Sequence, residues 1–196
     1  MPRLQSSAKS ILSTNDQERI MKKILALITL TALLVLTLAG CGDKAPSDIP
    51  KGYQIASVSD CDYVLYVPDT WMVDNQTLYT SAYHSSGDPT SISVTAGGMN
   101  FEDKTVEDWW KGYEEQFSEA FDSYELLSTE DAKLGGVDGK KFTYTAKMAD
   151  GQYNFICIAV VRNDYVYYML YTSTPEKYEA PLETLDEVVS YFEFKD

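Results

Sequence analysis

The chain has 196 residues, with 16 Lys and Arg against 30 Asp and Glu, and a net charge of −14. This acidity opposes binding to nucleic acid, which needs a basic surface, and it disfavours direct contact with anionic lipid headgroups. Aromatic residues make up 13% of the chain, so the composition favours a folded domain over an acidic disordered segment.

The N-terminal part has the pattern of a secretory signal. A lysine pair precedes an uninterrupted apolar run from Ile24 to Leu38, which ends in two small residues. A helix over this run would measure ~22 Å, shorter than the ~30 Å hydrocarbon core of a bilayer, so a cleavable signal peptide over 21–40 is favoured over a membrane-spanning helix. Residues 1–20 are polar and lack hydrophobic periodicity, and we interpret them as a spurious extension before a start at Met21.

Cys41 follows the apolar run directly, in the order Leu38-Ala39-Gly40-Cys41. This stretch resembles the lipobox of bacterial lipoproteins. The resemblance implies that the Cys41 thiol receives a diacylglyceryl group and that the chain is cut before it. We therefore expect a lipid-anchored protein on the outer face of the cell membrane. The alternative is an ordinary signal peptide followed by an incidental cysteine.

The first segments after Cys41 are a tether and two strands. Residues 41–52 are rich in proline and polar residues, which predicts a flexible tether. The aromatic and β-branched run 63–67 predicts a strand. Residues 91–96 alternate, which predicts a half-buried strand near a sheet edge. Its apolar face holds Ile92, Val94 and Ala96, and its polar face holds Ser91, Ser93 and Thr95.

A helix is predicted over 105–121. Thr105 and Asp108 have the spacing of a capping box, and Gly112 is a weak point within the helix. Aromatic residues recur at helical spacing, which favours core packing over a ligand site. They are Trp109, Trp110, Tyr113, Phe117 and Phe121.

Three strands are predicted over 142–148, 153–161 and 165–173, with turns at Asp150-Gly151 and Asn163-Asp164. This pattern indicates an antiparallel meander. The second and third of these strands are apolar on both faces, so both faces need cover. We therefore expect an α+β domain with helices on both faces of the sheet, a three-layer arrangement.

A second helix, over 181–192, is predicted to supply part of this cover. Thr174-Pro175 resembles a helix start, and Pro181 restarts the helix. Its apolar stripe consists of Leu182, Leu185, Val188, Val189 and Phe192.

The domain over 53–196 resembles the PsbP-like superfamily in three places. They are the early run Tyr66-Val67-Pro68-Asp69-Thr70-Trp71, the stretch Leu134-Gly135-Gly136-Val137-Asp138-Gly139 before the meander, and Tyr171 followed by the closing Val188-Val189-Ser190-Tyr191-Phe192. The resemblance implies an antiparallel sheet between helices. It also implies a binding, assembly or accessory role, with no shared catalytic residues.

Signals for catalysis or metal binding are weak. His84 lies in a polar, loop-like context and is interpreted as a solvated surface residue. Cys61 and Cys157 could form one disulfide outside the cytoplasm. Alternatively, Cys157 is a buried apolar residue of its strand and both thiols stay free.

Two further patterns have ordinary structural interpretations. The run Gly135–Gly139 lacks the ending of a phosphate-binding loop and predicts a turn. The acidic clusters within 102–108 and 114–122 are interpreted as a solvated helix face rather than a calcium site, which would need converging oxygens. We therefore expect no metal and no cofactor.

These observations favour a non-catalytic, lipid-anchored binding or accessory protein. The expected partners are the membrane, through lipid on Cys41, and an unidentified protein or envelope ligand; nucleic acid is not expected. The alternative is a carboxylate-dependent envelope hydrolase with a glycosidase-like pair of acids, which residue spacing alone does not reveal.

Overall fold

The computed structural model describes residues 48–74, 80–99, 105–121, 123–148, 151–178 and 182–195. The expectations for residues 1–47, namely the extension, the signal peptide, the lipidated Cys41 and most of the tether, lie outside these ranges. Gly52, at the end of the expected tether, contacts the domain, because the N–H of Asp69 donates to its carbonyl at 2.9 Å.

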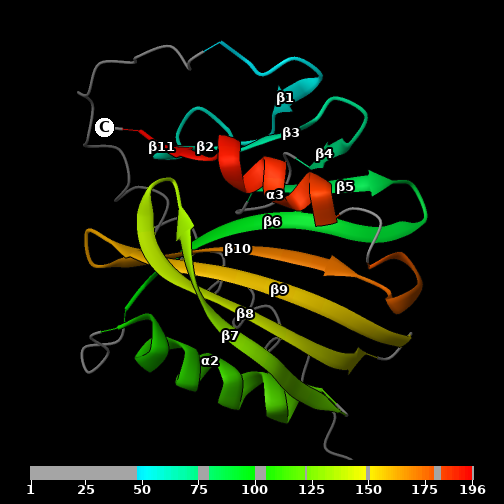
Figure 1. Cartoon of the computed structure of the whole chain (residues 1–196), viewed down its shortest axis with the longest axis vertical. Helices are drawn as coiled ribbons and strands as arrows, with labels where there is room; N and C mark the ends of the chain where they lie inside the picture. The colour runs from blue at the N-terminus through cyan, green and yellow to red at the C-terminus, as the bar shows by residue number, and fades with distance from the viewer. Residues whose placement is uncertain are drawn as a thin grey trace, which may run out of the picture. The chain divides into compact units, whose positions relative to one another are not determined.

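The centre of the fold is a seven-stranded antiparallel sheet in the order β4-β5-β6-β10-β9-β8-β7 (Figure 1). The expectation of an antiparallel sheet of several strands is therefore confirmed. The strands are β4 (Met72–Asp74), β5 (Thr80–Ser85), β6 (Asp88–Gly98), β7 (Tyr124–Leu134), β8 (Val137–Met148), β9 (Gly151–Arg162) and β10 (Tyr165–Ser173).

Four short strands form two further pairs. They are β1 (Tyr53–Ile55) with β3 (Tyr66–Pro68), and β2 (Tyr63–Val64) with β11 (Glu193–Phe194). The described helices are α2 (Val106–Ala120), α3 (Leu182–Tyr191) and a single 3-10 turn, η1 (Pro175–Lys177). Thr174-Pro175 therefore opens a short 3-10 turn, and the α-helix begins only at Leu182.

The predicted meander is present as β8, β9 and β10, each paired with the next. The turn between β9 and β10 has positive φ at both central residues, 52° at Asn163 and 64° at Asp164, as expected for a tight hairpin turn. The run from Gly135 is also a turn: Leu134 pairs with Val137, and the two glycines between them have φ of 56° and 79°.

Two cores lie on opposite faces of the sheet. Because side chains alternate along a strand, Ile156 and Ile158 of β9 join the first core, and Phe155 and Cys157 join the second core. We call the corresponding sides of the sheet the first face and the second face. This division confirms that β9 is apolar on both sides.

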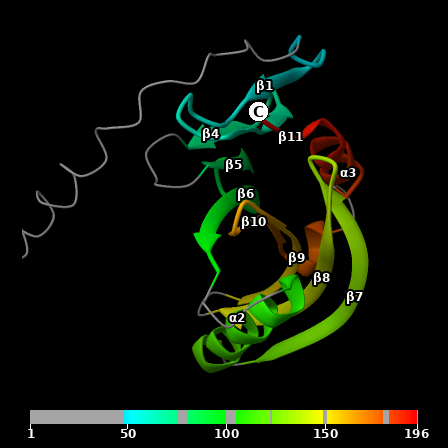
Figure 2. The same cartoon turned by 90° about the vertical axis from the view of Figure 1, so that its left-hand side faces the viewer.

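Each face carries one of the described helices. Leu185 and Val188 of α3 belong to the first core, and Trp110 of α2 belongs to the second core. The helices lie at different ends of the sheet (Figures 1 and 2). The three-layer expectation is met in part, because each helix covers only part of its face, and Leu65 and Val67 from the β2–β3 region also fill the first core.

The cap and packing of α2 follow the sequence pattern. The Thr105 hydroxyl accepts a hydrogen bond from the N–H of Asp108 at 3.1 Å, which satisfies one free donor of the first turn. The Trp110 ring stacks on Phe142 of β8, with ring centroids 3.9 Å apart and an interplanar angle of 4°. This contact fixes α2 over β8 and β9.

The expected edge position of the strand over 91–96 is wrong. This strand, β6, lies between β5 and β10 inside the sheet. The half-buried polar side chains Ser91, Ser93 and Thr95 face a part of the second face that α2 does not cover. The alternation of polar and apolar residues in β6 therefore reflects a face that α2 does not cover, and not a position at the edge of the sheet.

Candidate functional site

The second face has a covered half and an open half. The strand registers align one row of side chains across all seven strands on this face. The row consists of Met72, Tyr83, Ser91, Thr172, Phe155, Tyr144 and Leu126.

The two halves of this row differ in burial. Phe155 and Tyr144 are 4% and 0% exposed, and Phe117 of α2 packs on Tyr144 with ring centroids 5.7 Å apart. Met72 and Tyr83 are 54% and 40% exposed. We call the second-face side chains of β4, β5, β6 and β10 the open half.

The open half is lined with hydroxyl groups. These side chains alternate with buried Ile92 and Val94 of β6, so the rigid ladder of the sheet holds them in place. The half-buried hydroxyl-bearing residues are Ser91, Ser93, Thr95 and Thr172, whereas Ser81 on the same face is buried. Aromatic side chains border them: Trp109 of α2 lies against Tyr168 of β10, with ring centroids 5.2 Å apart.

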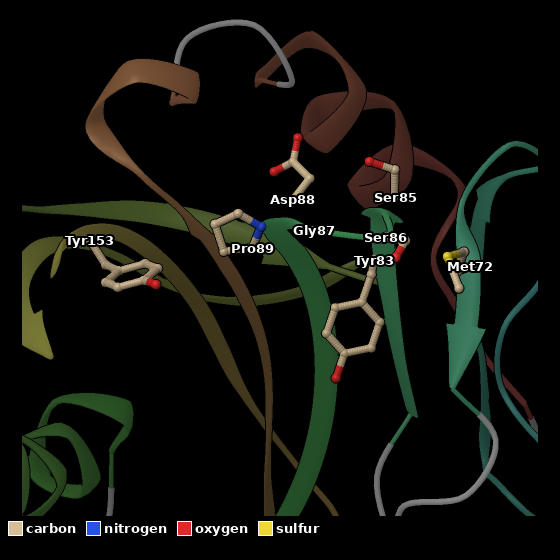
Figure 3. Close-up of a pocket in the computed structure, with 8 residues that line it drawn as sticks. All are labelled: Met72, Tyr83, Ser85, Ser86, Gly87, Asp88, Pro89 and Tyr153. Carbon is tan, nitrogen blue, oxygen red and sulfur yellow. The ribbon is translucent and has the colours of Figure 1, made fainter. Parts of the chain in front are cut away.

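A groove of about 510 Å³ lies at one end of the open half. Figure 3 shows Tyr153 and Met72 at its opposite ends, with Tyr83 between them. Its lining comes from β4, the β5–β6 hairpin and β9, and consists of Met72, Tyr83, Ser85, Ser86, Gly87, Asp88, Pro89 and Tyr153. Gly87 has φ of 80°, a conformation that suits glycine in this tight turn.

Asp88 is the charged residue of the groove lining, and its side chain is only 11% exposed. Burial raises the pKa of this carboxyl, but the hydrogen bonds from Lys177 at 2.8 Å and from the N–H of Thr90 at 3.0 Å outweigh burial and lower the pKa to about 2. His84 Nδ1 lies 3.3 Å from the same carboxylate oxygen as Lys177. The carboxylate is therefore ionised and already matched by a cation.

His84 is a surface residue, as the sequence indicates, but it has structural partners. Its side chain is 51% exposed, and its ring meets the buried Trp71 edge-on, with ring centroids 5.8 Å apart. It is not among the residues that line the groove. These contacts anchor the start of the β5–β6 turn.

The groove lacks the arrangement that the hydrolase alternative requires. A glycosidase-like site needs two carboxyl groups about 5–10 Å apart, and among the described lining residues only Asp88 supplies a carboxyl. Trp110 is 4% exposed and belongs to the second core. Trp109 stacks on Tyr113, with ring centroids 4.8 Å apart, so neither tryptophan lines this groove.

Several acidic residues of α2 have protein partners. Glu107 lies 3.0 Å from Lys140, and Glu114 accepts a hydrogen bond from Tyr124 at 2.9 Å. Within the described ranges, no group of three His, Cys, Asp or Glu residues is arranged to hold a metal ion.

Cys61 and Cys157 are free thiols and lie on opposite faces of the sheet. Cys157 is fully buried in the second core, where burial raises its pKa. Cys61 packs against the first core, and its sulfur lies 3.7 Å from the Thr80 hydroxyl. The disulfide that the sequence allowed is not formed in this structure.

None of the described helices is both long and apolar enough to cross a bilayer. In sequence, the chain matches no established family profile and no curated protein.

Solved structures show the fold. The cyanobacterial PsbP protein CyanoP of Synechocystis is 14% identical, with a TM-score of 0.55 over 80% of this chain and 98% of that chain. The yeast Ran-binding protein Mog1p, from Saccharomyces cerevisiae, is 12% identical, with a TM-score of 0.54 over 74% and 96%. LpqN of Mycobacterium tuberculosis aligns at 11% identity with a TM-score of 0.49 over 68% and 83%, so the assignment rests on the first two. The chain has a PsbP-like fold.

Proposed function

We propose that this protein is a lipid-anchored, extracytoplasmic binding or accessory protein that does not catalyse a reaction. The observation that carries the proposal is the open half of the second face with its groove. Side chains of the strands and of the β5–β6 turn present the hydroxyl groups and the exposed Tyr83 ring there. A pre-formed concave surface of this kind suits ligand recognition.

The arrangement of polar groups also favours binding over catalysis. Asp88 is committed to Lys177 and the N–H of Thr90, so its pKa is far from the range that suits a general acid or base near neutral pH. Ser91 and Thr172 are cross-strand neighbours, and their row contains no imidazole. A nucleophile would need such a base within hydrogen-bond reach.

The fold is compatible with an accessory role. Mog1p, which shares the fold, is a Ran-binding protein, so a protein with this fold can bind a partner. The identity is too low for the partner itself to carry over.

The lipid on Cys41 gives the proposed location. A diacylglyceryl group has two acyl chains, and two chains give stable anchoring where a single chain gives only marginal binding. The net charge of −14 repels anionic headgroups. The domain would therefore be held near the membrane by the lipid and stand away from its surface, which leaves the groove accessible.

Membrane fractionation of cells that express the full chain tests the proposed location. We expect the protein in the membrane fraction, accessible to protease added outside the cytoplasmic membrane. Cys41→Ala should release it or stop its maturation, whereas the matched control Cys61→Ala should remain membrane-bound, because Cys61 packs inside the domain. Membrane retention of Cys41→Ala would refute the lipid anchor.

A further inference from the structure

We propose that the groove between Tyr83 and Tyr153 is a binding site for a neutral oligosaccharide. This inference rests on the proposed binding function and names the ligand class. The groove combines flat apolar surfaces with hydroxyl groups. The apolar surfaces come from Tyr83, Tyr153 and Pro89, and the hydroxyl groups come from Ser85 and Ser86.

The aromatic groups supply the apolar surfaces. Tyr83 is 40% exposed although it lies within a sheet strand, so its ring is available to a ligand. Tyr153 is 7% exposed and belongs to the second core, so its position is fixed by packing. A sugar ring has one face of C–H groups and a rim of hydroxyls, and this face packs on an aromatic ring while the rim reaches polar groups.

The charges of the groove favour an uncharged ligand. Asp88 is ionised but matched by Lys177 at 2.8 Å and faces His84 at 3.3 Å. Among the lining residues that the structure describes, there is no lysine or arginine that could hold an anionic group. The net charge of −14 further opposes an anion.

The open half extends the site beyond the groove. Tyr83 pairs with Ser91, and the same face continues along β6 to Thr95, which pairs with Tyr168. The hydroxyl-bearing strand therefore leads from the groove to the Trp109–Tyr168 ring pair. The volume of about 510 Å³ is in the usual range for a small-ligand site, and a longer glycan would continue along β6.

Calorimetric and NMR titration of the full-length protein tests this inference, in a detergent without a sugar headgroup. The probes are hexamers of β-1,4-glucose, α-1,4-glucose and N-acetylglucosamine, with a capped neutral hexapeptide as the competing class. At least one hexasaccharide should bind saturably and shift the amide resonances of Ser86 and Gly87. Binding of the peptide alone, or of no hexasaccharide, would overturn the inference.

Three variants locate the site. Tyr83→Ala should weaken the binding about tenfold, because it removes the exposed ring. Tyr83→Phe should retain most of the affinity, because the ring remains. The control Tyr165→Ala removes a ring of similar exposure, 52%, at the start of β10, and should bind as the unmodified protein does.

Equal affinity of Tyr83→Ala and Tyr165→Ala would place the ligand elsewhere and refute the site. The same preparations report on the anchor, because membrane retention depends on Cys41 and not on Tyr83. A protein that stays anchored but binds no hexasaccharide therefore contradicts only the ligand class. A protein that binds a hexasaccharide without being anchored contradicts only the proposed location.

Discussion

Lys177 of η1 donates a hydrogen bond from Nζ to Oδ2 of Asp88 at 2.8 Å. This contact joins the segment after β10 to the first residue of β6, close to the groove. The Asp88 side chain is 11% exposed and that of Lys177 is 48% exposed, so solvent screens the pair only in part. Removal of the Lys177 charge or protonation of Asp88 should therefore change the stability of the domain.

Lys177→Met should lower the free energy of unfolding at pH 7 by about 0.5–1 kcal/mol, the usual range for a partly exposed pair. Because the folded pKa of Asp88 is lowered to about 2, the stabilisation is present above the ordinary carboxyl pKa near 4 and is lost as the pH falls toward 2. The difference between variant and parent should therefore shrink over this range in urea titrations. A difference in the free energy of unfolding that stays constant from pH 7 to pH 2 would contradict the role of the Asp88–Lys177 pair. The same difference in the control variant Lys51→Met would also contradict it.

Two buried tyrosines should respond oppositely to loss of their hydroxyl. The Tyr144 hydroxyl is buried and has no hydrogen-bond partner among the described residues. Tyr144→Phe should therefore leave the free energy of unfolding unchanged or raise it by up to about 1 kcal/mol. The Tyr63 hydroxyl donates to Thr80 at 2.9 Å, so Tyr63→Phe should lower the free energy of unfolding by about 1 kcal/mol. Equal losses in denaturant unfolding would refute the difference in bonding.

Two glycines should also respond oppositely to alanine. A Cβ on Gly139 would lie 2.0 Å from the carbonyl oxygen of Ala159 in β9, so Gly139→Ala should lower the free energy of unfolding by about 2–4 kcal/mol. A Cβ on Gly112 meets no atom within 4 Å, and Gly112→Ala should raise it by about 0.5–1 kcal/mol. Thermal unfolding of both variants checks the pair; a tolerated Gly139→Ala would contradict the close approach of β8 and β9.

The sequence predicts the strongly patterned elements well. The expected strand 165–173 coincides with β10, and the expected helix 105–121 differs from α2 by its two capping residues. These segments carry long apolar periodicity and clear end signals, so local physics determines them. The strand β7 was not predicted, because Leu126 and Leu127 are exposed and its other residues are mostly polar. An edge strand with a largely exposed face lacks the alternation of apolar and polar residues from which a strand is predicted.

The candidate groove was only partly predictable. The polar face of Ser91, Ser93 and Thr95 was visible in the sequence, but it indicated a solvated edge. The groove itself joins Met72 of β4, the hairpin around Gly87 and Tyr153 of β9. Residues so far apart in the chain meet only through the strand order, which the sequence pattern does not reveal. The pairing of Asp88 with Lys177 depends on the same long-range arrangement.

The mass of the N-terminal peptide of the membrane-extracted protein tests whether the protein is lipid-anchored outside the cytoplasm. We predict a peptide that begins at Cys41, with a mass increase for a diacylglyceryl group, with or without a third acyl chain on its amine. Digestion between Cys41 and the start of the ordered domain is suited to this, because Lys44 and Lys51 provide cleavage sites on the C-terminal side of Cys41. A mature protein with an unmodified Cys41, or one that retains residues 21–40, would contradict the account.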